Sequence, residues 1–332
     1  MNTFEHVTVT DGNEAVKLLS ERGGAAGETK IIAGGTDLLT LMNASLIAPQ
    51  RLVNLKAARA LRYLRFAEDG ALHIGALATL ADLERDAGVA RRLPILVESV
   101  RDAATPQLRA MATVAGNLLQ RPRCWYFRGA PHCWLKGGAE CFARDGENKY
   151  HAIFGASSCV AVHPSDLAPA LLALDAELLI NGPSGVRTLP LAAFFHEPTN
   201  DARIEHTLAP DEVITEIRVP GQPEGANGAY LKMMDRQAWA FALASAAAQL
   251  SVEDGVIQQA RIVLGGVATV PWRATQAEDA LTGQQLTPEL ARTAAEAALA
   301  GAAPLAHNGY KVPLARELVR RAILRAGSVP HP

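Results

Sequence analysis

Residues 30–43 read Lys-Ile-Ile-Ala-Gly-Gly-Thr-Asp-Leu-Leu-Thr-Leu-Met-Asn. The β-branched run 30–33 predicts a short strand, and the apolar spacing of 37–43 predicts a helix. Gly34, Gly35 and Thr36 are all that separates them, so the strand turns almost directly into the helix. Such a turn lets the main chain approach an anion closely and fits a diphosphate, although an ordinary tight turn uses the same residues.

The flanking sequence completes a small α/β unit over residues 1–57. Its expected elements are an extended stretch at 7–10, a helix from Asp11 to Ser20 ended by Gly23, Gly24 and Gly27, the turn at 30–43, and a strand at 51–54. Asp11 with Glu14 three residues later resembles the capping box of a helix start.

Two further units follow. Residues 58–220 predict strands at 71–75, 159–163, 177–180 and 216–219, with helices at 79–86, 91–100 and 166–174. A Pro- and Gly-rich linker ends at Gly228, and residues 229–328 then predict strands at 229–234, 241–250 and 257–265 before helices at 287–300 and 313–326. The expected fold class is therefore α+β.

The composition narrows the classes of function. Of the 332 residues, 49% are hydrophobic and 20% charged, so a sizeable core forms; the formal net charge is −2. That balance lacks the basic field that nucleic-acid binding usually needs, and no apolar stretch is long enough for membrane insertion. The first residues lack the features of a signal peptide, so we expect a cytoplasmic protein, or a periplasmic one if a signal-bearing partner subunit exports it.

All four cysteines fall within residues 121–159, and three of them lie in the part, 121–150, that shows neither a helical nor a strand period. Eight, seven and seventeen residues separate Cys124, Cys133, Cys141 and Cys159, which does not fit the short spacing of structural zinc knuckles. An iron-sulfur cluster tolerates less regular spacing. Zinc, disulfides and unrelated free thiols remain alternatives from the residues alone.

Two other short motifs could bind a long ligand together with the first turn. The run Ala112-Thr-Val-Ala-Gly-Asn117 supplies a second turn rich in N–H donors, and Ser165 and Asp166 could hydrogen-bond to hydroxyl groups. Ser165 and Asp166 are, however, equally typical of an ordinary helix start. The pattern G-x-G-x-x-G is absent, which disfavours a standard nicotinamide site.

The remaining polar residues indicate no catalytic side chain. The basic-aromatic run 121–128 could bind single-stranded nucleic acid, but Arg109, Arg121, Arg123 and Arg128 more plausibly serve a cofactor or a protein interface. The histidines at 151, 163 and 196 are expected to satisfy local hydrogen bonds. No Ser-His-Asp order or H-E-x-x-H pattern appears, so hydrolysis is disfavoured.

Four ordered motifs resemble one known family over essentially the whole chain. Ala33-Gly-Gly-Thr-Asp-Leu38, Ala112 to Leu118, His163-Pro-Ser-Asp-Leu-Ala168 and Val263-Leu-Gly-Gly-Val267 are similar to the FAD-binding medium subunit of molybdenum hydroxylases, the family of xanthine dehydrogenase and aldehyde oxidoreductases. The resemblance implies a two-subdomain, PCMH-like α/β FAD-binding domain, followed by a C-terminal antiparallel sheet with helices like that of CO dehydrogenase flavoproteins.

The resemblance also implies site residues. The FAD contacts carried over to this chain are Ile32, Ala33, Gly34, Gly35, Thr36, Asp37, Leu38, Thr113, Gly116, Asn117, Asp166 and Lys232. The cysteine-bearing stretch looks like the branch exemplified by the periplasmic aldehyde oxidoreductase flavoprotein subunit. That branch carries an extra 4Fe-4S cluster, with Cys124, Cys133, Cys141 and Cys159 as the implied ligands.

What the resemblance implies for function is electron transfer within a heterotrimer. A large molybdopterin subunit oxidises the substrate, a small subunit with 2Fe-2S clusters relays electrons, and the medium subunit passes them through FAD to an external acceptor. An aldehyde is the expected substrate of the assembly. A subunit of a 4-hydroxybenzoyl-CoA reductase-like or xanthine dehydrogenase-like enzyme, a stand-alone flavin oxidase, and a zinc-stapled interaction module are the alternatives.

Overall fold

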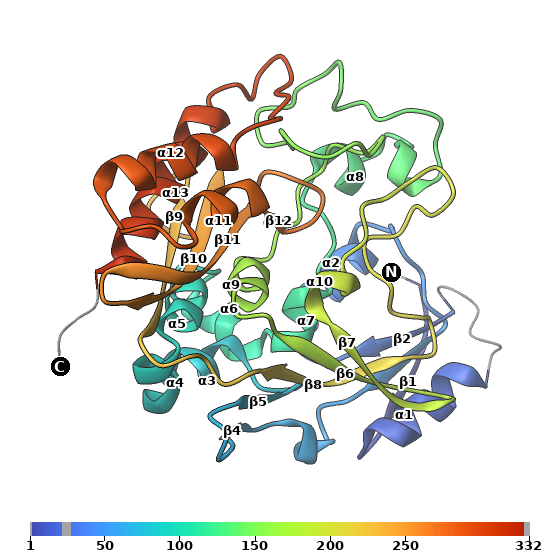
Figure 1. Cartoon of the computed structure of the whole chain (residues 1–332). Coiled ribbons are helices and arrows are strands. Elements are labelled where there is room, and N and C mark those ends of the chain that lie inside the picture. Colours follow the sequence, from blue (N-terminus) through green and yellow to red (C-terminus); the bar gives the residue numbers. More distant parts are fainter. Residues whose placement is uncertain (1, 22–27, 329–332) are drawn as a thin grey trace.

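The computed structural model describes residues 2–21 and 28–328. The expected helix end at Gly23, Gly24 and Gly27 therefore lies outside the described residues. Three sheets organise these described residues, and Figure 1 shows them with their covering helices. Each of the three stretches separated in the sequence contributes one sheet, which confirms the expected α+β class.

The first sheet is parallel, with strand order β1-β3-β2. Its elements are β1 (Glu5–Thr8), α1 (Gly12–Ser20), β2 (Thr29–Ile32), α2 (Leu38–Asn43) and β3 (Arg51–Asn54). Asp11 begins α1 as expected, because its carboxylate accepts from the N–H groups of Asn13 and Glu14. The buried face of α1 packs on Val53 and closes a small core.

The second sheet has the order β4-β5-β8-β6-β7, and its recorded strand pairs are antiparallel. Its strands are β4 (Leu64–Phe66), β5 (Leu72–Gly75), β6 (Glu177–Gly182), β7 (Gly185–Pro190) and β8 (Val213–Val219). Its helices are η1 (Arg59–Leu61), α3 (Leu80–Arg85), α4 (Ala87–Arg92), α5 (Pro94–Arg101), α6 (Pro106–Met111), α7 (Val114–Leu118), α8 (Trp125–Arg128), η2 (Trp134–Lys136), α9 (Leu167–Ala173) and α10 (Leu191–Phe194). Thr79 starts α3 with a complete capping box.

Two predictions for this unit were wrong. The expected helix over 91–100 is divided at Leu93, because Pro94 lacks an N–H group and disfavours helical geometry in the residue before it. The expected strand at 159–163 belongs to no sheet. Its backbone bonds go to separate loops, from Ala152 N–H to Val160 O and from His163 N–H to Ala268 O, so no ladder forms.

The third sheet is antiparallel, with the order β12-β11-β10-β9. Its elements are β9 (Ala226–Met233), β10 (Ala244–Glu253), β11 (Val256–Gly265), β12 (Trp272–Arg273), α11 (Thr275–Leu281), α12 (Pro288–Ala298) and α13 (Lys311–Gly327). Alternate residues of β10 serve two cores: Ala246 and Ala248 pack under α12 and α13, whereas Ala247 packs toward α9. The second and third units therefore share a buried interface.

The cysteine-bearing stretch 121–159 holds only two short helices, α8 and η2. In Figure 1 it lies, in green, between the C-terminal helices and the N-terminal sheet. Among the helices that the structure describes, none combines the length and the apolar character needed to cross a bilayer.

Candidate functional site

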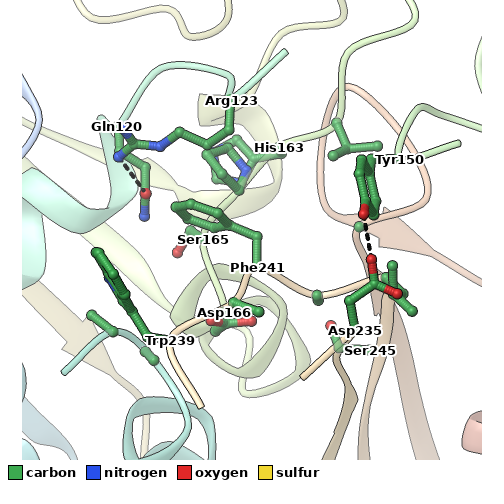
Figure 2. A pocket seen from close by; sticks show the side chains of 18 of the residues that line it. Gln120, Arg123, Tyr150, His163, Ser165, Asp166, Asp235, Trp239, Phe241 and Ser245 are labelled. Carbon is green, nitrogen blue, oxygen red and sulfur yellow. Dashed lines mark hydrogen bonds between the residues drawn. The ribbon is translucent and has the colours of Figure 1, made fainter. Parts of the chain in front are cut away.

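A cavity of about 900 Å³ lies where the three units meet. Thr36 reaches it from the first unit, Asn117 and Asp166 from the second, and Leu243 and Ser245 from the third. Figure 2 looks into this cavity. Its size and mixed polar and apolar walls suit a large planar ligand with polar appendages.

The first glycine turn packs directly against the second. A Cβ atom on Gly34 would lie 2.0 Å from Met111 O, at the end of α6 and just before the second turn. Gly35 has φ +71°, a backbone conformation that L side chains rarely adopt. The two turns that the sequence paired as one ligand site are therefore neighbours in space, and glycine is required at the contact.

The second turn is the start of α7. Thr113 caps this helix by accepting from Gly116 N–H at 3.2 Å, and Asn117 Oδ1 accepts from Ser165 Oγ at 2.6 Å. Ser165 Oγ also accepts from Ala168 N–H at 3.0 Å, so Ser165 rather than Asp166 caps α9. Asp166 is thereby free to bond elsewhere.

Asp166 pairs with a buried lysine on the third sheet. Lys232 Nζ donates to Asp166 Oδ2 at 2.8 Å and to Asp102 O at 2.9 Å, and Tyr230 Oη donates to Asp166 Oδ1 at 2.8 Å. The Lys232 side chain is fully buried. Burial raises the pKa of Asp166, and the charge and hydrogen bond of Lys232 oppose that rise. Lys232, which does not line the cavity, thus fixes the position of the Asp166 carboxylate, which does.

Asp37 is engaged by the cysteine-bearing stretch. Its carboxylate accepts from Arg123 Nη1 at 2.7 Å, from Arg128 Nη2 at 2.8 Å and from the Arg121 N–H at 2.9 Å. The arginines of the basic-aromatic run therefore tie this stretch to the first glycine turn. Arg109 lies elsewhere and pairs with Glu84.

The predicted contact residues divide into two groups. Thr36, Asn117, Asp166 and Cys124 line the cavity. Within the described residues, the other predicted positions lie outside this lining: Ile32, Ala33, Gly34, Gly35, Asp37, Leu38, Thr113, Gly116, Lys232, Cys133, Cys141 and Cys159.

The four cysteines converge on one apolar cluster that also contains Phe127 and Trp134. All four thiols are free, so the disulfide alternative does not describe this structure. A hydrogen bond with Cys159 lowers the pKa of Cys141 to about 6, and the same bond together with burial raises that of Cys159. Burial raises the pKa of Cys124 to about 11.

Backbone N–H groups point at several of these sulfur atoms. The donors are Tyr126 and Phe127 to Cys124, Ala143 and Val160 to Cys141, and Ala161 to Cys159. Over the described ranges, no three or more His, Cys, Asp or Glu side chains are arranged to hold one metal ion. A single zinc ion, which requires its sulfurs at about 2.3 Å, has no preformed site there.

The far wall of the cavity combines Arg123, which the sequence offered for a cofactor or a protein interface, with residues that the sequence did not single out. Tyr150 donates to Asp235, and Arg123 lies over the Phe241 ring at 5.1 Å. Figure 2 shows Phe241 between Arg123 and Asp166, with Trp239 at the cavity edge. Alternation along β9 could have revealed Tyr230, which shares a face with Lys232. Nothing local in the sequence marks Tyr150 or Phe241.

Two family descriptions match the sequence. Residues 2–222 match the FAD binding domain in molybdopterin dehydrogenase, and residues 229–326 match the CO dehydrogenase flavoprotein C-terminal domain. The aldehyde oxidoreductase FAD-binding subunit PaoB of Escherichia coli K12 is 37% identical over 98% of this chain and 99% of its own length. The carbon monoxide dehydrogenase medium chain of Hydrogenophaga pseudoflava is 28% identical over 96% of each.

Solved structures agree with these matches. Carbon monoxide dehydrogenase from Hydrogenophaga pseudoflava superimposes with a TM-score of 0.77 at 28% identity, covering 98% of this chain and 97% of that one. The cyanide-inactivated Cu,Mo-CO dehydrogenase gives 0.77 at 26% identity, covering 98% of both. The similarity extends through both the N-terminal units and the C-terminal unit.

Proposed function

This chain belongs to the FAD-binding medium subunits of the molybdenum hydroxylase family, and from that premise we propose that it serves a heterotrimeric aldehyde oxidoreductase. In this proposal it receives electrons from the 2Fe-2S clusters of a small subunit and passes them through FAD to an external acceptor. A large molybdopterin subunit oxidises the aldehyde. The observation that supports the proposal most is the convergence of three separate sequence motifs on one cavity.

The FAD site uses residues from each motif. The turn at Ile32–Leu38 with Thr113, Gly116 and Asn117 would hold the diphosphate end, with Thr36 and Asn117 lining the cavity itself. Asp166, supported by Lys232, would meet the ribityl hydroxyls. FAD supplies the capacity to accept single electrons and release two; the protein binds and orients it. No side chain is assigned as a general base.

Gly34→Ala tests the FAD site. The new Cβ would meet the Met111 carbonyl, so the two turns must separate and FAD content should fall at least tenfold. Gly309→Ala is the matched control, since nothing lies within 4 Å of a Cβ there. Flavin absorbance after denaturation measures the content. Equal FAD content in both variants would contradict the assignment of this turn.

We also propose that Cys124, Cys133, Cys141 and Cys159 hold a 4Fe-4S cluster. Support comes from the convergence of all four thiols in a shielded cluster with N–H donors aimed at sulfur, which suits thiolates bound to iron. In a cubane each thiolate binds a different iron, so the sulfurs need not surround one ion as zinc requires.

Cys133→Ser tests the cluster assignment. Iron and sulfide should fall to a small fraction of the wild-type content in anaerobically purified protein. Leu46→Ala alters packing on the same apolar cluster without removing a thiol, and should keep its iron. Zinc in place of iron in the wild type would favour the interaction-module alternative instead.

The remaining alternatives differ in partners. A stand-alone flavin oxidase would oxidise benzaldehyde with a dye acceptor as a purified single chain, whereas the proposed subunit would need both partners. A 4-hydroxybenzoyl-CoA reductase-like or xanthine dehydrogenase-like assembly would share the flavin spectrum and differ in the substrate of the co-purified large subunit.

For location, we propose the cytoplasm, or the periplasm if a signal-bearing partner exports the assembly. Fractionation of cells that express all three subunits distinguishes these two.

A further inference from the structure

One lysine lies behind the cavity wall without a carboxylate partner. Lys311, the first residue of α13, has no exposed surface. Its ammonium donates to Gly266 O at 2.7 Å and to Tyr150 O at 3.0 Å. Within the described residues, no ion pair is recorded for it, and burial lowers its pKa to about 7.

Stability alone does not explain a lysine at this position. Removing an ammonium from water without an opposite charge is costly, and two carbonyl dipoles compensate only part of that cost. The N-terminus of a helix is also the end at which a positive charge is disfavoured. A buried titratable group with a shifted pKa beside a cavity is a candidate for a functional role.

The two carbonyls that Lys311 holds belong to residues that line the cavity. Gly266 adopts φ +69°, and a Cβ there would lie 2.9 Å from Ala242 O, so the wall is tightly packed at this point. Tyr150 reaches across the cavity mouth and donates to Asp235, as Figure 2 shows. Lys311 thereby connects the C-terminal helix to both wall segments.

We propose that Lys311 is a positioning residue for the flavin, which holds Tyr150 and Gly266 in the cavity wall and places a positive charge behind it. A flavin gains negative charge on reduction, and a nearby cation in a poorly hydrated site favours that form. This inference rests on the proposed function only in requiring that the cavity bind FAD. It is independent of the 4Fe-4S assignment.

The test is a redox titration of the flavin in the complete chain with its partner subunits. The titration is run at a pH below the lowered pKa of Lys311, where its amine is protonated. At a potential that half-reduces the wild-type flavin, Lys311→Gln should lower the ratio of reduced to oxidised flavin about tenfold, which is about 30 mV for a two-electron couple. Lys311→Met should lower this ratio similarly and also weaken FAD binding, because it cannot hold the two carbonyls. Lys311→Arg, which keeps the charge, should recover part of the ratio.

Arg316→Gln is the matched control. It removes one positive charge from the exposed face of the same helix, where solvent screens the charge, so the flavin potential should not move. A Lys311→Gln protein that keeps its FAD and titrates like the wild type would overturn the inference. A wild-type protein without FAD would instead refute the proposed function before any variant is compared, so the two failures are distinguishable. If Lys311→Met fails to fold, the glutamine and arginine variants still decide the question.

Discussion

Two buried lysines bond to residues that line the same cavity, and their charges are compensated differently. Lys232, on β9, donates to the Asp166 carboxylate and shares it with the Tyr230 hydroxyl. Lys311, at the start of α13, donates to the carbonyls of Tyr150 and Gly266, and no carboxylate among the described residues pairs with it. The first wall contains Asp166 and is held by an ion pair to Lys232 on a regular strand. The second wall contains Tyr150 and Gly266 and is a loop region held through its backbone carbonyls.

The second wall is held by a continuous series of bonds to the C-terminal unit. Five of these join His307 N–H to Asn148 Oδ1, Tyr310 Oη to Lys149 O, Lys311 Nζ to Tyr150 O, and Asn308 Nδ2 to His151 O and to Ala152 O. A stretch without regular secondary structure is ordered here by side chains from far along the sequence. One wall therefore depends on charge compensation and the other on satisfied carbonyls.

The largest effect is expected from breaking the ion pair. Asp166→Ala leaves the Lys232 ammonium buried with one carbonyl, which should reduce the free energy of unfolding by about 3–5 kcal/mol and abolish FAD retention. Denaturant unfolding measures the loss.

The double variant Asp166→Ala with Lys232→Met should recover much of that stability, but not the FAD. Asp235→Ala, which breaks the exposed pair with Lys149, should change the free energy of unfolding by less than about 1 kcal/mol. If Asp166→Ala and Asp235→Ala lost similar amounts of unfolding free energy, the buried Lys232 charge would not depend on its carboxylate partner.

The burial of Lys311 should make the free energy of unfolding depend on pH. The unfolded chain keeps this proton up to the ordinary lysine pKa, whereas the folded protein releases it near the lowered pKa of about 7. Between these values the unfolded state binds more protons, so stability rises with pH. From pH 7 to 9, the wild type should gain roughly 2 kcal/mol relative to Lys311→Met. A constant difference between the two proteins would contradict the burial of a strained amine.

The sequence anticipated the two glycine-bearing turns because their determinants are local. Gly34 and Gly35 mark a turn where a side chain cannot fit, and Thr79 caps the helix that the sequence predicted to start there. The pairing of the two glycine turns also followed from the need of one long ligand for two binding points. These signals depend on a few neighbouring residues, so they can be recognised in the sequence without knowledge of the fold.

The second wall could not be anticipated in the same way. Lys311 looks like any lysine near a helix start, and its two acceptors lie 161 and 45 residues away. Residues 159–163 have the apolar composition of a strand, yet their backbone partners are separate loops. Asp37 resembles a helix cap, but its charge is used by arginines of the cysteine-bearing stretch. Such long-range choices require the tertiary structure.

Removing a hydrogen-bond donor from the second wall should change the free energy of unfolding less than the titration of Lys311 does. Asn308 is fully buried, and Asn308→Ala would leave the carbonyls of His151 and Ala152 without this donor. We expect a loss of about 1–2 kcal/mol and weaker retention of whatever the four cysteines bind. Asn43→Ala, at the exposed end of α2, is the control and should be neutral. Unfolding curves and metal analysis of both variants provide the comparison.

The smallest effect is expected at the cavity mouth. Tyr150→Phe removes the hydroxyl that binds Asp235, but both residues are exposed, so water replaces most of the lost bond. Stability should fall by less than about 1 kcal/mol, while residues 235–241 should become more sensitive to limited proteolysis because this tether to the wall is lost. Because the backbone carbonyl of Tyr150 still accepts from Lys311, the flavin potential should stay near that of the wild type. A large shift in potential would show that the phenol, and not the buried ammonium behind it, sets the environment of this wall.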